Sequence, residues 1–319
     1  MKKILVVRFS SIGDIVLTTP VIRCLKKQLD VEVHYLTKSS FKGILENNPY
    51  VTKVHVIEKE ISKELIAQLQ YENFDFIADL HANLRTFRLK KALRVSYKSV
   101  LKLHIKKWLL VHLKMDRMPK LHIVDRYLDT VKHLGVLNDM EGLDYFIPKQ
   151  AHVDVNRLPK LHSAGYVGFV IGGQHATKML STQKIIEVCQ GLKEPIVLLG
   201  GPEDANRGHL IEKAVGVRVF NACGKFKLDE SASIVKQASW IVTHDTGLMH
   251  IAAAFKKRIV SVWGNTVPEL GMHPYLSDSS SKMLEIKGLS CRPCSKIGFD
   301  KCPRGHFKCM DHKVSDFQI

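Results

Sequence analysis

The chain has 319 residues, 45% of them apolar, which is enough to bury large cores and predicts two domains. No apolar run is long enough to cross a bilayer, and the first one, Ile4–Val7, ends at Arg8, so we expect a cytoplasmic protein without a signal peptide. Lys and Arg number 48 against 31 Asp and Glu, and the net charge of +17 favours a polyanionic partner: nucleic acid, an anionic membrane surface or a phosphorylated substrate.

Strands and helices alternate in the first half of the chain. The apolar pattern predicts strands at residues 3–7, 31–36, 51–57 and 76–79, and helices at residues 14–29, 61–70 and 126–134. Gly135 directly follows the last of these helices and is its expected C-cap.

The stretch from Arg85 to Lys120 holds twelve basic residues and one acidic residue, Asp116. Apolar residues, among them Trp108, interleave with these charges at roughly helical spacing. Such a basic amphipathic segment suits an anionic interface, and a solvated helical face without a partner is the alternative interpretation. A nucleic-acid-binding protein is another class that the charge allows, but the sequence has no helix-turn-helix, zinc-finger or RNA-binding aromatic pattern. We therefore expect no nucleic-acid partner.

The alternation resumes in the second half, after a looser stretch at residues 138–161. Strands are predicted at residues 166–171, 196–199, 217–221, 240–243 and 258–262, and helices at residues 182–192, 204–214, 229–238 and 246–255. Alternation of this kind indicates parallel sheets with helices on both faces. We expect an α/β fold of two Rossmann-like domains, residues 1–155 and 156–319, whose parallel sheets face a central cleft.

Ligands of open parallel sheets bind beyond the carboxyl ends of the strands. Four polar or glycine-rich loops follow predicted strands: Ser10–Asp14, Gly172–Lys178, Gly200–Glu203 and His244–His250. Three of the four lie in the second half, which marks that half as the nucleotide-binding side.

In the first of these loops, Asp14 opens a helix after the tight turn that Gly13 permits. Its carboxylate is suited to act as a general base if an acceptor hydroxyl lies within hydrogen-bonding distance. A simple helix N-cap is the competing interpretation of Asp14.

The loop that ends the strand at residues 240–243 opens a helix at Asp245-Thr246-Gly247. Helix openings carry unpaired backbone N–H groups and a partial positive charge, which suit a phosphate. Gly247 lets a ligand approach the backbone, and His250 lies about one turn further along the helix. An ordinary strand–turn–helix capped by Asp245 or Thr246 explains the same pattern.

The remaining two loops offer groups for the rest of a nucleotide. Thr177 and Lys178 end a glycine-containing loop that can wrap a diphosphate, with Lys178 offsetting the charge of a leaving group. The spacing is not that of a Walker loop. Glu203 follows Gly200-Gly201 and suits ribose hydroxyls, although a solvated carboxylate is equally compatible with the pattern.

Taken in order, these motifs resemble those of glycosyltransferase family nine, the ADP-heptose:lipopolysaccharide heptosyltransferases. The similarity spans nearly the whole chain and includes Arg8–Pro20, Asp79–Arg85, Gly172–Lys178, Asp245–His250 with the Ala252–Ala254 run, Trp263–Thr266 and the cysteine-rich end. The resemblance implies a GT-B fold whose N-terminal domain binds the acceptor and whose C-terminal domain binds the nucleotide sugar. It also implies inverting transfer of heptose from ADP-heptose to the lipopolysaccharide inner core, without a metal or another cofactor.

The resemblance further implies a role for individual residues. Asp14 is the implied base, and Lys178 the catalytic cation beside the leaving diphosphate. The implied donor-binding residues are Thr177, Glu203, Asp245, Thr246, Gly247 and His250. The implied acceptor-binding residues are Ser10, Ser11, Gly13, His81, Asn83 and Arg85. The basic segment would then give a salt-sensitive, peripheral contact with phosphorylated lipid A cores at the anionic inner membrane face.

The sequence departs from the family pattern at two places. Met179-Leu180-Ser181 stands where the family often has an aromatic residue and then proline, and Gln174-His175 is unusual in the loop before it. These departures leave another nucleotide sugar open as the donor. A non-catalytic module that binds a nucleotide sugar or a lipid is a further alternative, although the presence of Asp14, Lys178 and Asp245 argues against it.

Four of the seven cysteines gather near the C-terminus: Cys291, Cys294, Cys302 and Cys309, with His306 between the last two. The spacing of the first pair is common in zinc sites, and the spacing of the second pair is not. We expect reduced thiols that stabilise a compact tail, with a zinc site as the alternative. The other three lie in apolar surroundings and are expected to be inert core residues: Cys24, Cys189 and Cys223.

Overall fold

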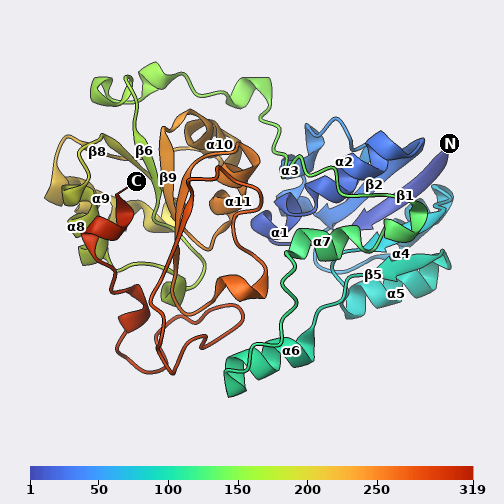
Figure 1. Cartoon of the computed structure of the whole chain (residues 1–319). Helices are drawn as coiled ribbons and strands as arrows, with labels where there is room; N and C mark the ends of the chain where they lie inside the picture. The colour runs from blue at the N-terminus through green and yellow to red at the C-terminus, as the bar shows by residue number, and fades with distance from the viewer. Residues whose placement is uncertain (319) are drawn as a thin grey trace. The chain divides into compact units, whose positions relative to one another are not determined.

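The computed structural model describes residues 1–318, which divide into two compact units (Figure 1). The first unit comprises Met1–Lys102 and Leu121–Phe146, and the second comprises Leu103–Lys120 and the chain from Ile147 onward. The change of unit therefore falls before the predicted boundary at residue 155. No helix of the described residues is long and apolar enough to cross a membrane.

The first unit is built on a five-stranded sheet in the order β3-β2-β1-β4-β5, with every neighbouring pair parallel. Its strands are β1 (Lys2–Val7), β2 (Val31–Lys38), β3 (Lys53–Ile57), β4 (Phe76–Asp79) and β5 (Tyr97–Ser99). Its helices are α1 (Ile12–Val16), α2 (Thr19–Gln28), α3 (Gly43–Glu46), α4 (Lys63–Tyr71), α5 (Leu84–Leu93) and α7 (Ile123–Leu128).

The second unit is built on a six-stranded sheet in the order β11-β10-β9-β6-β7-β8, again parallel throughout. Its strands are β6 (Val167–Val170), β7 (Ile196–Leu199), β8 (Val219–Asn221), β9 (Trp240–His244), β10 (Ile259–Trp263) and β11 (Lys282–Glu285). Its helices are α6 (His104–Trp108), α8 (Thr182–Gly191), α9 (Ala205–Val215), α10 (Leu228–Gln237) and α11 (Gly247–Ala254).

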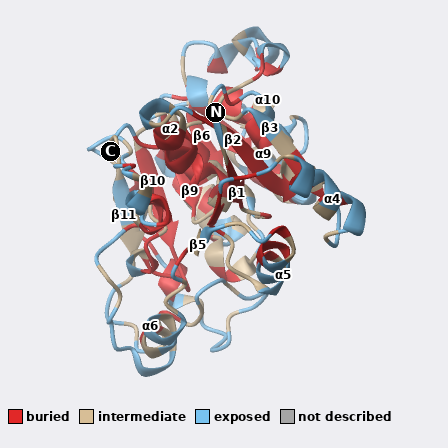
Figure 2. Ribbon diagram, turned by 90° about the vertical axis from the view of Figure 1, so that its right-hand side faces the viewer, coloured by how far each residue is buried: buried red, intermediate tan, exposed pale blue. Residues whose placement is uncertain are grey.

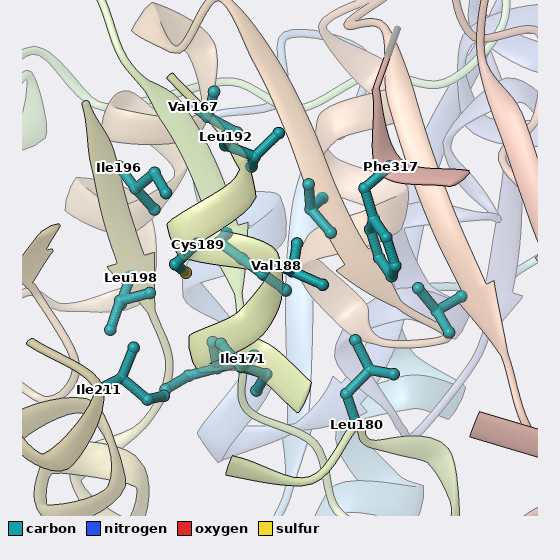
Figure 3. Packing of buried hydrophobic residues seen from close by; sticks show 14 of the residues in the cluster. Val167, Ile171, Leu180, Val188, Cys189, Leu192, Ile196, Leu198, Ile211 and Phe317 are labelled. Atoms are coloured by element: carbon teal, nitrogen blue, oxygen red, sulfur yellow. The ribbon is translucent and has the colours of Figure 1, made fainter. Parts of the chain in front are cut away.

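The central strands of both sheets are buried along most of their length, as parallel strands covered by helices on both faces must be. Figure 2 shows β1, β6 and β9 as buried ribbons, whereas parts of α4 and α6 are exposed. In the second unit, Val188 and Cys189 of α8 pack over Ile196 and Leu198 of β7, and Phe317 joins the same cluster from the end of the chain (Figure 3). Burial of one such aliphatic or aromatic side chain contributes about 1.5–3 kcal/mol.

The predicted α/β class with two parallel sheets is confirmed, and most predicted elements agree with the structure within a few residues. The single helix predicted at residues 14–29 is wrong, because the chain forms α1 and α2 with a break at Leu17–Thr18. Pro20 lies in the first turn of α2, where its missing N–H costs nothing, so it begins a helix rather than continuing one. Gly135 does end a helical turn, in the left-handed conformation with φ +87°.

The spacing of the basic segment predicted one amphipathic helix, and this prediction is wrong. It is divided among α5, the strand β5, α6 and a π-helical turn at Leu109–Leu113. Arg94 and Leu103 adopt left-handed backbone conformations that end one element and precede the next. Tyr97, Lys98 and Ser99 pair with β4 instead of extending the helix.

Candidate active site

In the first unit, two polar loops follow neighbouring strands at the point where the sheet order reverses. β1 lies between β2 and β4, so the connections that leave β1 and β4 pass to different sides. Open parallel sheets bind ligands beyond the carboxyl ends of the strands at such a point. Ser10–Asp14 follows β1, and His81–Arg85 follows β4. The predicted base and all of the predicted acceptor-binding residues therefore lie at this one edge of the sheet.

Asp14 is held by three contacts at the start of α1. Its Oδ1 lies 2.6 Å from Nη2 of Arg8, and its Oδ2 accepts hydrogen bonds from the backbone N–H and the hydroxyl of Ser11 at 3.2 and 2.9 Å. The N-cap of α1 is Ser11, and Asp14 closes the capping box three residues later, so Asp14 itself is not the N-cap. Its side chain remains 22% exposed, which leaves a fixed carboxylate that a substrate can reach.

Arg8 is a site residue to which the sequence interpretation gave no role. Its guanidinium donates to the carbonyl oxygens of Ser10 and Leu80, each at 2.8 Å, and so ties the loop after β1 to the end of β4. Burial acts to lower the pKa of Arg8, but Tyr127 and Asp14 outweigh it and hold the pKa above its ordinary value. The sequence feature that could have indicated this role is the position of Arg8 directly after a buried strand.

The loop after β4 gathers aromatic and cationic groups around the ring of Phe9. The His81 ring lies 4.8 Å from that of Phe9, and the Arg85 guanidinium lies 5.1 Å from it. Burial, reinforced by Arg8 and Lys102, lowers the pKa of His81 to about 4, so this imidazole is neutral at pH 7.

Asn83 has a structural function in the same loop. Its side-chain oxygen accepts a hydrogen bond from the backbone N–H of Thr86 at 3.0 Å, and the Thr86 hydroxyl accepts one from the backbone N–H of Asn83. This capping box fixes the first turn of α5. Asn83 therefore helps to place Arg85, the second residue of that helix.

The second sheet reverses its order between β6 and β9, and the predicted donor loops follow these strands. Lys178, at the end of the loop after β6, lies with its Nζ 2.6 Å from Oδ2 of Asp245, at the end of β9. Thr266, after β10, donates its hydroxyl hydrogen to the same oxygen at 3.2 Å. Three loops that are distant in sequence thus meet at one carboxylate.

Helix α11 begins beside this pair. Its N-cap is Thr246, whose side chain makes no capping hydrogen bond to any residue that the structure describes. The N–H groups of the first turn, which starts at Gly247, are therefore available to an anion. His250 is on the same helix and is 2% exposed.

Thr177 precedes the lysine but does not present a free hydroxyl. Its Oγ1 donates to the carbonyl oxygen of Phe299 at 3.0 Å and accepts from the Phe299 N–H at 2.8 Å. The Thr177 N–H donates to the same Phe299 carbonyl at 3.1 Å. Thr177 is therefore clamped to a segment 122 residues away, and this clamp positions Lys178.

The loop after β7 has one exposed and one buried carboxylate. Glu203, the predicted ribose ligand, is exposed. Asp204 is buried, its pKa is raised by that burial, and its Oδ2 accepts the Gly201 N–H at 2.9 Å. A Cβ at Gly172 or Gly200 would collide with the Asp204 side chain, so both glycines are needed for close approach of the two loops.

His244 and Arg207 fix the far end of the loop after β6. His244 is fully buried, and its Nε2 accepts the backbone N–H of Leu180 at 3.0 Å. Burial, reinforced by Arg207, lowers the pKa of His244 to about 3 and keeps the ring neutral. Arg207 donates to the carbonyl oxygen of Ile171 and to the hydroxyl of Thr182, both at 3.2 Å.

Asn265 is a second residue to which the sequence interpretation assigned no role. It is 1% exposed, and neither atom of its side-chain amide has a hydrogen-bond partner among the described residues. Its backbone N–H donates to the carbonyl oxygen of Thr177 at 3.3 Å, which places it beside the donor loop. A buried amide without a partner costs about 1–3 kcal/mol, a cost that a bound ligand can offset. The sequence feature that could have indicated Asn265 is its position after a buried strand, within the Trp263–Thr266 motif.

Among the described residues, one group of metal-ligand type, His34, His55 and Glu72, has its ligand atoms within 4.8 Å of one another. The His34 and His55 rings are hydrogen-bonded at 3.0 Å, and Glu72 accepts from Lys3 and Lys53 at 3.1 and 2.6 Å. The Glu72 carboxylate is therefore already paired with two ammonium groups. His34, His55 and Glu72 form a hydrogen-bonded network that joins β2, β3 and α4.

The four C-terminal cysteines are free thiols. Three of them are partly exposed and the fourth is buried: Cys291, Cys294, Cys302 and Cys309. The other three cysteines are buried, as predicted: Cys24, Cys189 and Cys223.

Comparison with known proteins places this arrangement in a family. The model of glycosyltransferase family 9 (heptosyltransferase) matches residues 63–298. Lipopolysaccharide heptosyltransferase 1 of Campylobacter coli is 24% identical over 293 residues, which cover 83% of this chain and 84% of that protein.

Solved structures show the same fold. A glycosyltransferase family 9 protein from Veillonella parvula superposes with a TM-score of 0.73 at 23% identity, covering 89% of this chain and 86% of that one. The ADP-heptose lipopolysaccharide heptosyltransferase II of E. coli superposes with a TM-score of 0.70 at 20% identity, covering 92% of this chain and 95% of that one. The chain belongs to glycosyltransferase family 9, the heptosyltransferases, and is a glycosyltransferase with the GT-B class of fold.

Proposed function

We propose that this enzyme transfers heptose from ADP-heptose to the inner core of lipopolysaccharide, with inversion at the anomeric carbon. The observation that carries the proposal is the Lys178–Asp245 pair beside the uncapped start of α11, at the reversal point of the second sheet. A cation and a row of free N–H groups at such a point suit a diphosphate. The names of the relatives, one of them an ADP-heptose enzyme, supply the donor sugar and the acceptor.

The proposed reaction is a single displacement. Asp14 removes the proton from an acceptor hydroxyl, and the oxygen attacks the anomeric carbon of the donor. The bond from that carbon to the diphosphate oxygen breaks, and ADP leaves with the electron pair. Lys178 and the first N–H groups of α11 stabilise the charge that develops on the diphosphate, so the proposal requires no metal or other cofactor.

The donor-binding roles divide between residues that touch the nucleotide sugar and residues that position the loops. Lys178, Thr246, Gly247 and His250 surround the proposed diphosphate and sugar site, and Glu203 is exposed for the ribose. Asp245 orients Lys178 in the free enzyme, and Thr177 is a positioning residue because Phe299 engages its hydroxyl. We add Asn265 to the site, because its side-chain amide is buried without a partner.

Acceptor binding is assigned to the edge that presents Ser10, Ser11, Gly13, His81 and Arg85. A phosphorylated saccharide suits this edge, because it carries two guanidinium groups and a neutral hydrogen-bonding ring, His81. The Arg8 guanidinium is bonded to the Ser10 carbonyl oxygen, and the Arg85 guanidinium lies 5.1 Å from the Phe9 ring. Asn83 acts indirectly, through the cap of α5.

An anionic membrane surface is the proposed second partner. Four apolar side chains in and after α6 are 77%, 53%, 52% and 43% exposed, namely those of Ile105, Trp108, Leu113 and Met115. Basic side chains alternate with them: Lys106, Lys107, Lys114, Arg117 and Lys120. Exposed apolar groups among cations suit the headgroup region of an anionic bilayer, where a lipid-linked acceptor is held.

A thermal-shift panel of ADP- and UDP-sugars tests the proposed donor. ADP-heptose is expected to raise the melting temperature of the wild-type chain, because a ligand that binds only the folded state stabilises it by mass action. Lys178→Ala should lose most of this shift, and Lys184→Ala, a lysine of the same unit on α8, should keep it. A preference for UDP-sugars would overturn the donor assignment.

A further inference from the structure

The donor loops of the second sheet follow strands that are neighbours in the order β10, β9, β6 and β7. Along this edge, in the same order, lie Asn265, Asp245, Lys178 and Glu203. Neighbouring strands are about 4.8 Å apart, so the edge from β10 to β7 extends over about 14 Å. A ribose, a diphosphate and a sugar joined in line can lie along an edge of this length.

This order gives a bound nucleotide sugar a direction. Glu203 is the proposed ribose ligand, and Lys178 with the start of α11 forms the proposed diphosphate site. In a nucleotide sugar the diphosphate lies between the ribose and the sugar. The sugar therefore extends from the diphosphate towards β10, away from β7. This step rests on the proposed function.

Asn265 has the side chain best suited to the hydroxyl groups of that sugar. Among the residues that follow β10, Gly264 has no side chain, and Thr266 donates its hydroxyl hydrogen to Oδ2 of Asp245. The Asn265 amide has a hydrogen-bond partner at neither its nitrogen nor its oxygen among the described residues. An amide presents two N–H donors and an acceptor oxygen, so it complements two neighbouring hydroxyl groups.

The backbone of Asn265 is fixed beside the diphosphate site. Its N–H donates to the Thr177 carbonyl oxygen at 3.3 Å, and its carbonyl oxygen accepts the Cys294 N–H at 3.0 Å. The Arg292 guanidinium donates to the carbonyl oxygens of the residues before and after it, at 2.7 and 3.1 Å. No hydrogen bond to a described residue holds the amide itself, so a change of rotamer towards a ligand breaks none of these bonds.

The fold satisfies another buried asparagine of this unit and leaves Asn265 without a partner. Asn221, at the end of β8, donates from Nδ2 to the Ala205 carbonyl oxygen at 3.0 Å and accepts the Cys223 N–H at 3.1 Å. Asn265 is 1% exposed, and a polar group buried without a partner lowers the stability of the folded state. A residue that is unfavourable for the fold is typical of a ligand-binding site.

We propose that Asn265 determines the specificity for the donor sugar, by binding two neighbouring hydroxyl groups of that sugar with its side-chain amide. The ligand class is a nucleotide sugar with adjacent hydroxyl groups, such as a heptose, and not a deoxy sugar that lacks one of them. A site that hydrogen-bonds a hydroxyl group rejects an analogue without it, because its own polar groups then remain unpaired.

The stability of the unliganded chain tests whether the amide lacks a partner. Asn265→Leu removes the polar atoms and keeps the approximate shape, so it should raise the melting temperature by about 2–4 °C. Asn221→Leu is the matched control, a buried asparagine at the same edge of the sheet whose amide is bonded. Its melting temperature should fall.

Calorimetric titration with ADP and with ADP-heptose, without an acceptor, tests the assignment to the sugar. Asn265→Leu should weaken ADP-heptose binding about 10-fold or more, because two hydrogen bonds to the sugar are lost. Its affinity for ADP should equal that of the wild type, because ADP has no sugar beyond the diphosphate. Asn265→Ala adds no atoms and should give the same result however leucine packs.

Two results would overturn the proposal. A fall in melting temperature for Asn265→Leu like that for Asn221→Leu would show that the amide is bonded within the fold, for example to an internal water. Equal affinities of variant and wild type for ADP-heptose, or equal weakening of ADP and ADP-heptose, would show that Asn265 does not read the sugar.

Failure of the proposed function would appear in the wild type instead. A wild-type chain that binds another nucleotide sugar in place of ADP-heptose would reject the proposed donor. The inference would still hold if leucine weakened that nucleotide sugar and spared its free nucleotide. A wild-type chain that binds no nucleotide sugar would reject both.

Discussion

Nζ of Lys178 lies 2.6 Å from Oδ2 of Asp245, although the two residues are 67 positions apart in the chain. The contact joins the loop after β6 to the loop after β9, the two connections that leave the sheet where its strand order reverses. In the free enzyme the carboxylate therefore holds the cation that the proposed diphosphate would take over. An ammonium already oriented in this way costs less to order when the donor binds.

Replacement of Lys178 by alanine should reduce kcat/KM for the donor by about 100- to 1,000-fold, the usual effect of removing one group that stabilises a developing anion. The fold should be unaffected, because the side chain is partly exposed and its partner Asp245 keeps the Thr266 hydroxyl. Steady-state kinetics with ADP-heptose measure the effect. Equal loss in Lys184→Ala would mean that general charge, rather than this lysine, is responsible.

Replacement of Thr177 by valine should weaken donor binding without removing any group that touches the donor. Valine retains the shape but leaves the carbonyl oxygen and N–H of Phe299 without their hydroxyl partner, at a cost of about 1–3 kcal/mol. Urea unfolding and ADP titration measure the two effects, and Thr177→Ser should restore both. A valine variant with wild-type stability and altered kcat alone would indicate direct contact with the substrate.

The edge on which these residues lie could be predicted from the sequence, because buried parallel strands are recognisable as apolar runs and their carboxyl ends are the binding edge. The hydrogen-bond partner of each side chain could not be predicted from the sequence. The hydroxyl of Thr177 pairs with Phe299, 122 residues away, in a segment that has no periodic pattern.

Of two adjacent carboxylates, Glu203 faces solvent while Asp204 grips Gly201, and sequence alone cannot say which one turns inward. The edge strands β5 and β11 were also missed, since they are only 3 and 4 residues long and are half exposed. Strands that short have too few positions for an alternating pattern to stand out.

Stability should fall as the pH is lowered through the range below neutrality. Burial, with Arg207, holds the pKa of His244 at about 3 in the folded chain, against an ordinary value of 6.5. The unfolded chain therefore binds more protons below pH 6.5, so the stabilisation is fully present above that pH and is lost as the pH falls towards 3.

Urea midpoints measured between about pH 7 and pH 4 test this linkage. His244→Gln, whose side-chain oxygen can still accept the Leu180 N–H, should give a shallower decline than wild type. Part of the fall in stability at low pH should remain in this variant, because burial also lowers the pKa of His55 and of His81 to about 4. Parallel curves for the two proteins would contradict the assignment to His244.

Binding to anionic vesicles should depend on the apolar side chains of α6. Trp108→Glu should reduce co-sedimentation with vesicles of phosphatidylglycerol and phosphatidylethanolamine, because it places a charge in the proposed contact and removes its largest apolar group. Leu210→Glu is the matched control, since Leu210 of α9 is 58% exposed and lies outside the basic segment. Binding should weaken with added salt, and equal binding of both variants would exclude α6 as the contact.

The most direct test of the account is the rate of heptose transfer by Asp14→Ala, measured with ADP-heptose and an inner-core acceptor. The account predicts a loss of about 100- to 10,000-fold in kcat, with unchanged ADP affinity. The melting temperature should fall below that of the exposed control Asp30→Ala, because alanine removes the contacts of Asp14 with Ser11 and Arg8. Transfer at the wild-type rate by a correctly folded Asp14→Ala enzyme would contradict it.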